Sequence, residues 1–203
     1  MKLAKELLMT TLRDKKTKRP LFRRTAHQLA SVLAHEAADH LEIQEKPITT
    51  PLAPATGTAL KRPIVLVPIL RSGITMLPAF LDVFDDATVG VVGLKRDEKT
   101  AIAHWYYENL PLLTGAQQII ILDPMIATGG TGVETLRKLK EFDIMQDRIL
   151  FVSIVCAPEG LDAIRAEFPN ITIITCAIDD HLNAEKFIIP GLGDFGDRYF
   201  GTE

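Results

Sequence analysis

The stretch ILDPMIATGGTG, residues 121–132, places a loop of glycine and threonine between an apolar run and a helical pattern. Gly129 and Gly130 carry no Cβ, so the backbone can approach a ligand closely, and Thr128 and Thr131 offer hydroxyl donors. The first N–H groups of the following helix would lack partners within the helix. These groups and the positive end of the helix dipole favour an anion, so the stretch can bind a phosphate group.

Asp123 lies at the edge of this loop, where the apolar run ends. An ionised carboxylate only accepts hydrogen bonds, so it repels phosphate and attracts the hydroxyl groups of a sugar. The stretch therefore predicts a sugar-phosphate site, in which Asp123 binds the hydroxyls and the loop binds the phosphate. No Gly-Lys-Ser/Thr follows the glycines, which excludes a Walker phosphate loop. The spacing alone leaves open a plain glycine-rich turn with a capping threonine.

Two further stretches have residue types suited to a related ligand. Arg71, in PILRSG, follows an apolar run, and its guanidinium could bind a diphosphate with two parallel hydrogen bonds or be an ordinary surface group. GLGDFG, residues 191–196, matches the dinucleotide pattern G-x-G-x-x-G, but Pro190 precedes it and we expect no helix after it. We interpret it as a loop whose backbone approaches a flat base.

The patterns for metal binding are weak. His35 and His40 do not share one face of a helix, so they do not form the zinc pattern H-E-x-x-H. Asp179, Asp180 and His181 invite a metal interpretation, but a polar loop after a strand is the simpler one. We predict no metal site made by side chains of the protein.

These candidate residues need elements that bring loops to one edge of a sheet. Strands are expected at 63–70, 87–94, 117–123, 148–155 and 171–178, and helices between them at 73–84, 131–142 and 159–168. Strands that alternate with helices predict an α/β fold with a doubly wound, mainly parallel sheet. Such sheets bind ligands beyond the carboxyl ends of their strands, where Asp123 lies.

The remaining segments complete a single domain over residues 1–203. Residues 20–41 have the apolar spacing of an amphipathic helix, which gives an N-terminal helical segment. Residues 47–57 are rich in Pro and Thr and are expected to form a loop. Residues 103–111 carry aromatic side chains between polar ones and are expected to form an exposed β-hairpin arm.

Composition limits the classes of function. The chain has 203 residues, 47% of them hydrophobic, and a net charge of −3, so it has a core of its own but no field that attracts nucleic acid. No apolar run is long enough to span a membrane, and Lys5 and Glu6 interrupt any signal peptide. Cys156 and Cys176 are expected to be reduced thiols. We therefore expect a cytoplasmic protein that binds neither nucleic acid nor membrane.

Five stretches in order resemble the uracil phosphoribosyltransferases, a family within the type I phosphoribosyltransferases. They are LRDKKT with FR and LAHEA near the N-terminus, PILRSG, GLKRDE followed by WYYENLP, ILDPMIATGGTG, and FIIPGLGDFGDRYFGT. The resemblance covers nearly the whole chain. The Asp-Pro pair at 123–124 is a departure from most of the class, which has two acidic residues there, and is similar to the uracil enzymes in particular.

The resemblance implies a reaction of uracil with phosphoribosyl pyrophosphate (PRPP) that gives UMP and diphosphate. It implies Asp123 and Arg71 as catalytic residues, and a non-proline cis peptide before Arg71. The implied PRPP-binding residues are Arg71, Arg96, Asp123, Pro124, Met125, Ile126, Ala127, Thr128, Gly129, Gly130, Thr131 and Asp194. The implied uracil-binding residues are Ile188, Gly193, Asp194 and Phe195.

The resemblance further implies Mg²⁺ that arrives with PRPP, a homodimer or homotetramer, and GTP as a candidate effector. Family members usually have Tyr at Phe187 and often Ala at Phe195, which puts side-chain contacts with the base in doubt. We expect the backbone of the 188–195 loop to read uracil. Two alternatives stay open: a phosphoribosyltransferase for another base, and a regulator that senses PRPP or uracil and binds RNA.

Overall fold

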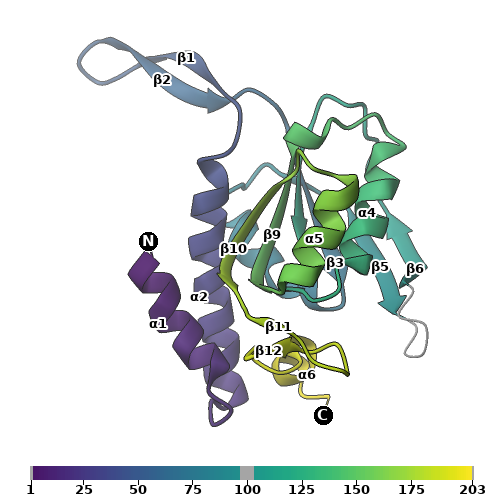
Figure 1. Cartoon of the computed structure of the whole chain (residues 1–203). Coiled ribbons are helices and arrows are strands. Elements are labelled where there is room, and N and C mark those ends of the chain that lie inside the picture. Colours follow the sequence, from purple (N-terminus) through teal and green to yellow (C-terminus); the bar gives the residue numbers. More distant parts are fainter. Residues whose placement is uncertain (1, 97–102, 203) are drawn as a thin grey trace.

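The computed structural model describes residues 2–96 and 103–202 and has an α/β architecture (Figure 1). The main strands are β3 (Ile64–Leu70), β5 (Val91–Arg96), β6 (Ala103–Asn109), β7 (Gln118–Leu122), β9 (Ile149–Cys156) and β10 (Thr172–Ile178), with short β4 (Thr88–Val89) and β8 (Met125–Ile126). Within the described ranges these eight form one sheet, with the order β10-β9-β7-β3-β5-β6 along its main path. All neighbours on this path are parallel except β5 and β6. The predicted mainly parallel sheet is confirmed.

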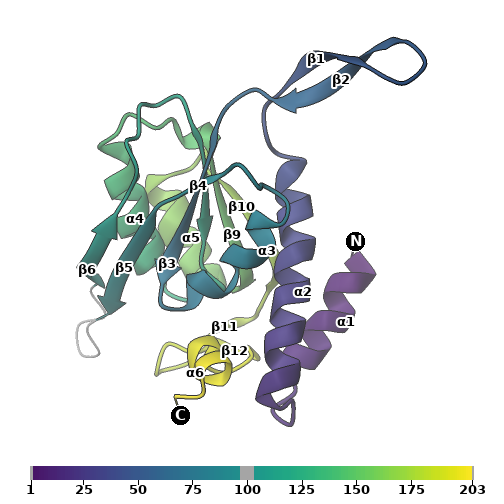
Figure 2. The ribbon, with the colours of Figure 1, turned by 180° about the vertical axis from the view of Figure 1, so that it is seen from behind.

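Helices cover both faces of the sheet (Figures 1 and 2). One face packs against α1 (Lys2–Arg13), α2 (Arg19–Ala38) and α3 (Leu77–Leu81), and the other against α4 (Gly130–Lys140) and α5 (Pro158–Glu167). In β7, Ile120 and Leu122 join the first layer, whereas Ile119 and Ile121 join the second. Since both faces are buried, the central strands are continuous apolar runs, and for this reason the sequence predicts them well.

A long β-hairpin arm occupies the segment that was expected to be a loop. It consists of β1 (Ile43–Thr49) and β2 (Pro54–Leu60), antiparallel from the pair Ile43–Leu60 to the pair Thr49–Pro54. The prediction of a loop at 47–57 is therefore wrong. Every residue of β1 is exposed, so no alternation of apolar and polar residues indicates a strand. The arm extends away from the sheet (Figures 1 and 2).

Other predicted boundaries change in smaller ways. The expected hairpin at 103–111 is present as the β5–β6 pair. The helix expected at 73–84 is divided into a 3-10 turn (Ser72–Thr75) and α3, and the strand expected at 87–94 is divided into β4 and β5 at Gly90. The short elements β11 (His181–Leu182), β12 (Ile188–Ile189) and α6 (Phe195–Phe200) follow the sheet, and a 3-10 turn (Gln146–Arg148) precedes β9.

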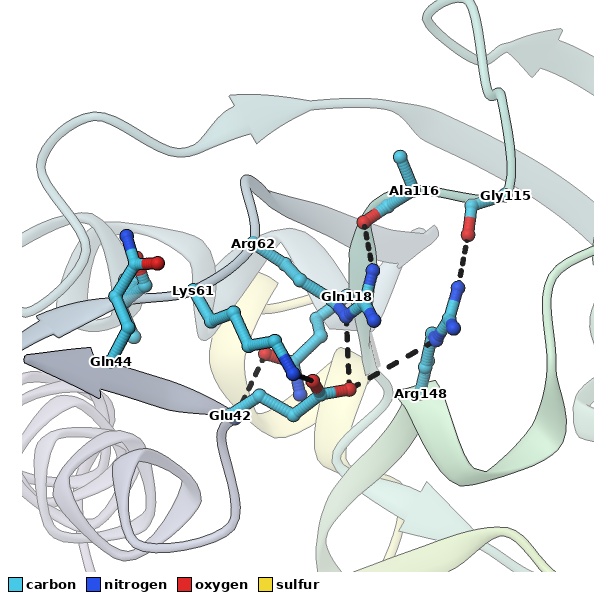
Figure 3. A network of polar contacts seen from close by, with 9 residues as sticks. Glu42, Gln44, Lys61, Arg62, Gly115, Ala116, Gln118 and Arg148 are labelled. Carbon is cyan, nitrogen blue, oxygen red and sulfur yellow. Dashed lines mark hydrogen bonds and ion pairs between the residues drawn. The ribbon is translucent and has the colours of Figure 1, made fainter.

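A network of charges holds the root of the arm at the amino edge of the sheet (Figure 3). Oε1 of Glu42 lies 2.9 Å from Nε of Arg62 and 4.0 Å from Nε of Arg148, and Oε2 lies 3.1 Å from Nζ of Lys61. The main-chain N–H of Glu42 donates to Oε1 of Gln118, the first residue of β7, at 3.0 Å. Through its carboxylate and its main-chain N–H, Glu42 thus joins the root of the arm to the starts of β9 and β7.

Among the described residues, no helix has the length and apolar character that crossing a membrane requires.

Candidate active site

The carboxyl edge of the sheet gathers the candidate residues from several strands. Arg71 follows β3, Asp123 follows β7, and Asp179 follows β10. The segment with β11, β12 and α6 lies at this edge, at the end of the sheet opposite to the arm (Figure 1). The structure therefore places these candidate residues beyond the strand ends, and their role in binding stays a prediction.

The glycine–threonine loop surrounds a small hollow. Its lining consists of Asp123, Met125, Ile126, Ala127, Thr128, Gly129, Gly130, Thr131, Gly132 and Phe151. Its volume of about 80 Å³ is far below the roughly 300–1,000 Å³ of pockets for drug-sized ligands, so it fits a single phosphate-sized group. The hollow lies at the first turn of α4, where helix N–H groups lack partners within the helix.

The start of α4 is not capped by a threonine. The cap residue is Gly129, with a positive φ of 78° and no side-chain hydrogen bond. A Cβ on Gly129 would lie 2.5 Å from the Gly160 carbonyl oxygen, and one on Gly160 would lie 2.4 Å from the Ala127 carbonyl oxygen. The loop and the first turn of α5 are therefore in backbone contact, and both positions require glycine. Gly160 is a supporting residue that no local motif indicated.

Asp123 is half-buried beside this hollow. Burial raises the pKa of its carboxyl to about 7, partly offset by the N–H of Met125, which lies 3.5 Å from Oδ1. Among the residues that the structure describes, no cation forms an ion pair with Asp123. The carboxyl therefore has the acceptor capacity for hydroxyl groups of a ligand, and cationic charge brought near it would favour its ionised form.

Arg71 lies on the loop that follows β3, the strand beside β7 in the sheet. The peptide bond between Leu70 and Arg71 is cis, as the resemblance implied. A Cβ on Gly73 would lie 2.1 Å from the Leu122 carbonyl oxygen, so this loop rests directly on the end of β7, next to Asp123. The Arg71 side chain is exposed, and the structure gives it only weak contacts. Its Nη2 lies 3.4 Å from Oδ1 of Asp197, and its guanidinium lies 5.2 Å from the centre of the Phe200 ring.

The predicted base loop ends in a helix, which corrects the expectation that no helix follows GLGDFG. Asp194 is the N-cap of α6, and its Oδ1 accepts a hydrogen bond from the N–H of Asp197 at 2.8 Å. With six residues that include Gly196, α6 is too short for a helical period to be visible in the sequence. A Cβ on Gly196 would lie 2.9 Å from Oγ of Ser72, so α6 closes against the Arg71 loop.

The side chain of Phe195 points into the core rather than toward a ligand. It is 1% exposed, and its ring lies 5.3 Å from that of Phe22 and 5.9 Å from that of Tyr199. Gly193, in contrast, is exposed, with a φ of 79°, and a Cβ there would meet only Cδ of Arg198, at 3.5 Å. Main-chain groups near Gly193 are therefore more open to a ligand than the Phe195 side chain.

Arg96 is the last residue of β5, and its side chain lies outside the described part of the chain, as do Asp97 and Glu98. Its predicted contact with PRPP stays a prediction.

Asp179, predicted as part of a polar loop, is a buried partner of Arg13. No local pattern could indicate this pair, because the two residues lie 166 positions apart.

The cysteines have no features of a nucleophile. Cys156 and Cys176 are both free, as expected, and burial raises the pKa of their thiols to about 11 and about 12. A thiol with a raised pKa is a weak nucleophile at neutral pH. Over the described residues, His, Cys, Asp and Glu form no group of three that could hold a metal ion.

Comparisons with known proteins agree with this geometry. Residues 2–202 match the family model described as uracil phosphoribosyltransferase. The chain is 41% identical over 197 residues to the uracil phosphoribosyltransferase of Streptomyces griseus subsp. griseus, which covers 96% of this chain and 92% of the relative. It is 38% identical over 196 residues to that of Limosilactobacillus reuteri, which covers 96% and 93%.

Solved structures give the same result. The AQ2163 protein from Aquifex aeolicus superposes with a TM-score of 0.90 at 37% identity, over 99% of this chain and 95% of that one. A hypoxanthine-guanine phosphoribosyltransferase from Bacillus anthracis has a TM-score of 0.51 at 10% identity, over 78% and 79%, which is a likeness of fold alone. From its strand order, the loops at its carboxyl edge and these matches, the chain belongs to the uracil phosphoribosyltransferase family.

Proposed function

We propose that the protein is a pentosyltransferase that converts uracil and PRPP into UMP and diphosphate, a step of pyrimidine salvage. One observation carries the proposal. The phosphate-sized hollow with Asp123, the Arg71 loop and the 188–195 loop meet at one edge of the sheet. They correspond to the parts that the reaction needs: a place for the 5′-phosphate and ribose, one for the diphosphate, and one for the base.

The chemistry asks mainly for position and charge. The C1′–O bond of PRPP breaks, the diphosphate leaves with the electron pair, N1 of uracil bonds to C1′, and the N1 proton passes to the solvent. Positive charge grows on the ribose while negative charge grows on the diphosphate. Asp123 binds the ribose hydroxyls and lies near the positive charge. Arg71 leaves its weak contact with Asp197 and binds the diphosphate with two hydrogen bonds.

Mg²⁺ enters this proposal as part of the PRPP substrate. The described residues offer no group of three potential ligands, and Asp123 alone does not make a site. Mg²⁺ commonly keeps several waters and binds through substrate phosphates with one or two carboxylates, which agrees with this donor set. The bound ion supplies positive charge to the departing diphosphate.

The base is read by main-chain groups of Ile188, Gly193 and Phe195. The support is that the Phe195 ring is buried and Gly193 is exposed. Cytosine has an amino donor where uracil has O4, so it would leave a main-chain donor without a partner. We expect discrimination of up to about 10⁴-fold in kcat/KM, and we expect it to persist in Phe195→Ala measured per folded molecule.

The proposal also includes a homodimer or homotetramer, a cytoplasmic location and GTP as a candidate effector. An exposed arm with Ile43, Ile48, Leu52 and Leu60 at its surface supports self-association. Two free thiols suit a reducing compartment. Light scattering of the purified protein tests its oligomeric state, and turnover with and without GTP tests the effector.

The decisive experiment is turnover of PRPP with a panel of bases, with Mg²⁺ present or chelated. We expect UMP and diphosphate to form from uracil with Mg²⁺, with little product from cytosine, purines or chelated samples. Equal rates with uracil and cytosine would refute uracil specificity. Absence of turnover, together with a salt-dependent shift of RNA in a gel, would favour the alternative of an RNA-binding regulator.

A further inference from the structure

Asp179 is a buried carboxylate directly beside the proposed base loop. It follows β10, its side chain is 4% exposed, and its main-chain N–H donates to the Cys156 carbonyl at 2.9 Å. A carboxylate is costly to bury unless cations or N–H groups surround it. Asp179 has three such donor contacts.

Two of the donors belong to Arg13, the last residue of α1. Its Nη1 and Nη2 groups donate to Oδ2 and Oδ1 of Asp179 at 2.7 and 2.5 Å, which is a bidentate pair. The hydrogen bonds that Arg13 donates to Asp179 raise the pKa of the Arg13 guanidinium. The planar fork of arginine suits this geometry, which an ammonium group cannot reproduce.

The third donor is the N–H of Gly191, at 2.8 Å from Oδ2 of Asp179. The carbonyl of Gly191 in turn accepts a hydrogen bond from Nη1 of Arg13 at 2.8 Å. One ion pair therefore binds both polar main-chain groups of a single loop residue. Gly191 has a φ of 60°, and a Cβ there would lie 2.1 Å from the Ile188 carbonyl oxygen, so only glycine fits this turn.

A second link between the same parts comes from α6. Nη1 of Arg198 donates to the Leu192 carbonyl at 2.7 Å, and Nη2 donates to the Asp14 carbonyl at 2.9 Å. The guanidinium of Arg198 also lies 4.4 Å from the centre of the Phe22 ring. The end of α1 thus contacts Gly191 through Arg13, and Arg198 links the turn after α1 to Leu192; these are the two residues that precede Gly193.

We propose that Arg13 and Asp179 are positioning residues for the base, because together they fix the peptide groups that lead into the uracil-reading main chain. The inference rests on the proposed function of the 188–195 loop. It also gives a role to the LRDKKT stretch, which the proposed chemistry does not otherwise use.

The reason for an effect on binding is pre-organisation. A loop that is already ordered loses little freedom when the base binds, whereas a loop that must become ordered weakens binding. Without the pair, the Gly191 peptide groups could rotate, and the main chain at Gly193 would no longer present fixed donors and acceptors. Most of the PRPP residues, Arg71 and residues 123–131, lie on the loops after β3 and β7, with which the pair makes no contact among the described residues. Asp194 is the exception, because it lies in the base loop itself. A positioning role therefore predicts different effects on the two substrates.

The test compares KM for uracil with KM for PRPP in Asp179→Asn and Arg13→Lys. In Asp179→Asn, we expect KM for uracil to rise at least about tenfold while KM for PRPP stays within about threefold. Arg13→Lys keeps the charge but loses the bidentate geometry of the guanidinium. KM for uracil should therefore rise less in this variant, about three- to fivefold. Because both residues act on Gly191 as one unit, KM for uracil in the double variant should be no higher than in Asp179→Asn alone.

A matched control is Arg137→Lys. Arg137 forms a bidentate pair with Glu167 that joins α4 to α5 on the surface, with Nε 3.0 Å from Oε2, and it does not contact the base loop. The Arg137→Lys variant should have the same KM for uracil and for PRPP as the parent protein. Parallel rises of both KM values, or no rise, in folded variants would overturn the inference. If Asp179→Asn does not fold, the same comparison of the two KM values in Arg13→Lys tests the inference. A parent protein without uracil turnover would instead overturn the proposed function.

Discussion

The two edges of the central sheet differ in whether they contain charged groups without strong partners. At the amino edge, Glu42 is paired with Arg62, Lys61 and Arg148, and its backbone is bound by Gln118. At the carboxyl edge, Asp179 is paired with Arg13, but Asp123 has no cationic partner among the described residues, and Arg71 has only weak contacts with Asp197, at 3.4 Å, and with the Phe200 ring.

The difference separates charges that hold the fold together from charges that are available to a ligand. A carboxylate with several donors can accept few further hydrogen bonds, so it suits a structural role. A half-buried carboxyl without a cation, such as Asp123, gains when a ligand brings hydroxyl groups and positive charge to it. Variants of Asp123 and Arg71 at the carboxyl edge should therefore lower activity, and variants of the Glu42 network at the amino edge should lower stability.

The largest expected effect belongs to Asp123→Asn, which keeps the size and removes the charge. A hydrogen bond to a charged group contributes about 1.5–3 kcal/mol, so kcat/KM for PRPP should fall about tenfold to a hundredfold. Steady-state kinetics at fixed uracil and Mg²⁺ measure this. An unchanged kcat/KM would place Asp123 among the structural charges and remove the contrast between the edges.

Arg71→Lys should have the next largest effect. The variant keeps the charge but loses the two-pronged geometry that suits a diphosphate, so kcat/KM should fall about tenfold. The fall should exceed what any loss of folded protein explains, because Arg71 is exposed and weakly bound in the free protein. If unfolding experiments show a loss of stability while kinetics per folded molecule are unchanged, Arg71 is structural.

The pH dependence of stability should also report on Asp123. The folded carboxyl has a pKa of about 7, above its ordinary value, so the folded protein binds this proton more tightly than the unfolded chain does. This contribution to the free energy of unfolding is full below pH about 4 and is lost as the pH rises through about 7. Because the side chain keeps some contact with solvent, we expect a loss of about 1–3 kcal/mol.

Urea unfolding at pH 5.5 and 8.5, with and without the Asp123→Asn substitution, measures this loss. The asparagine does not titrate, so the variant should lose less stability than the parent between the two pH values and should be the more stable protein at pH 8.5. The same pH dependence in both proteins would mean that the pKa of Asp123 is not raised in the folded protein.

Glu42→Gln should have the smallest effect, and it should lower stability rather than activity. Its ion pairs lower the pKa of the Glu42 carboxyl, so their contribution to stability is present above its ordinary pKa and is lost as the pH falls through the lowered value. At pH 7 the variant should have a slightly lower Tm, with kcat/KM per folded molecule within about twofold of the parent. The difference in Tm should shrink in acid. A large loss of activity would show that the arm affects catalysis.

The sequence predicts the parts of this molecule that local patterns encode. Buried parallel strands are apolar runs, and residues 123–131 combine a carboxylate, glycines and threonines after such a run, so the sheet and the position of this loop at its edge could be predicted. The arm could not, because β1 has no buried face. The helix after Asp194 was missed because six residues show no period. The partners of Asp179 come from opposite ends of the chain, which no local motif records.

The contact between Arg13 and Asp179 also orders the events of biosynthesis. The two residues are separated by 166 positions, so their contact closes a long loop and forms after the local helices and strands. On the ribosome, α1 is made early, but its carboxylate partner emerges only when most of the chain has been translated. Until then, α1 lacks the ion pair that fixes its end. The end of α1 and the 188–195 loop, which this pair links, are therefore expected to become fixed together, late in synthesis.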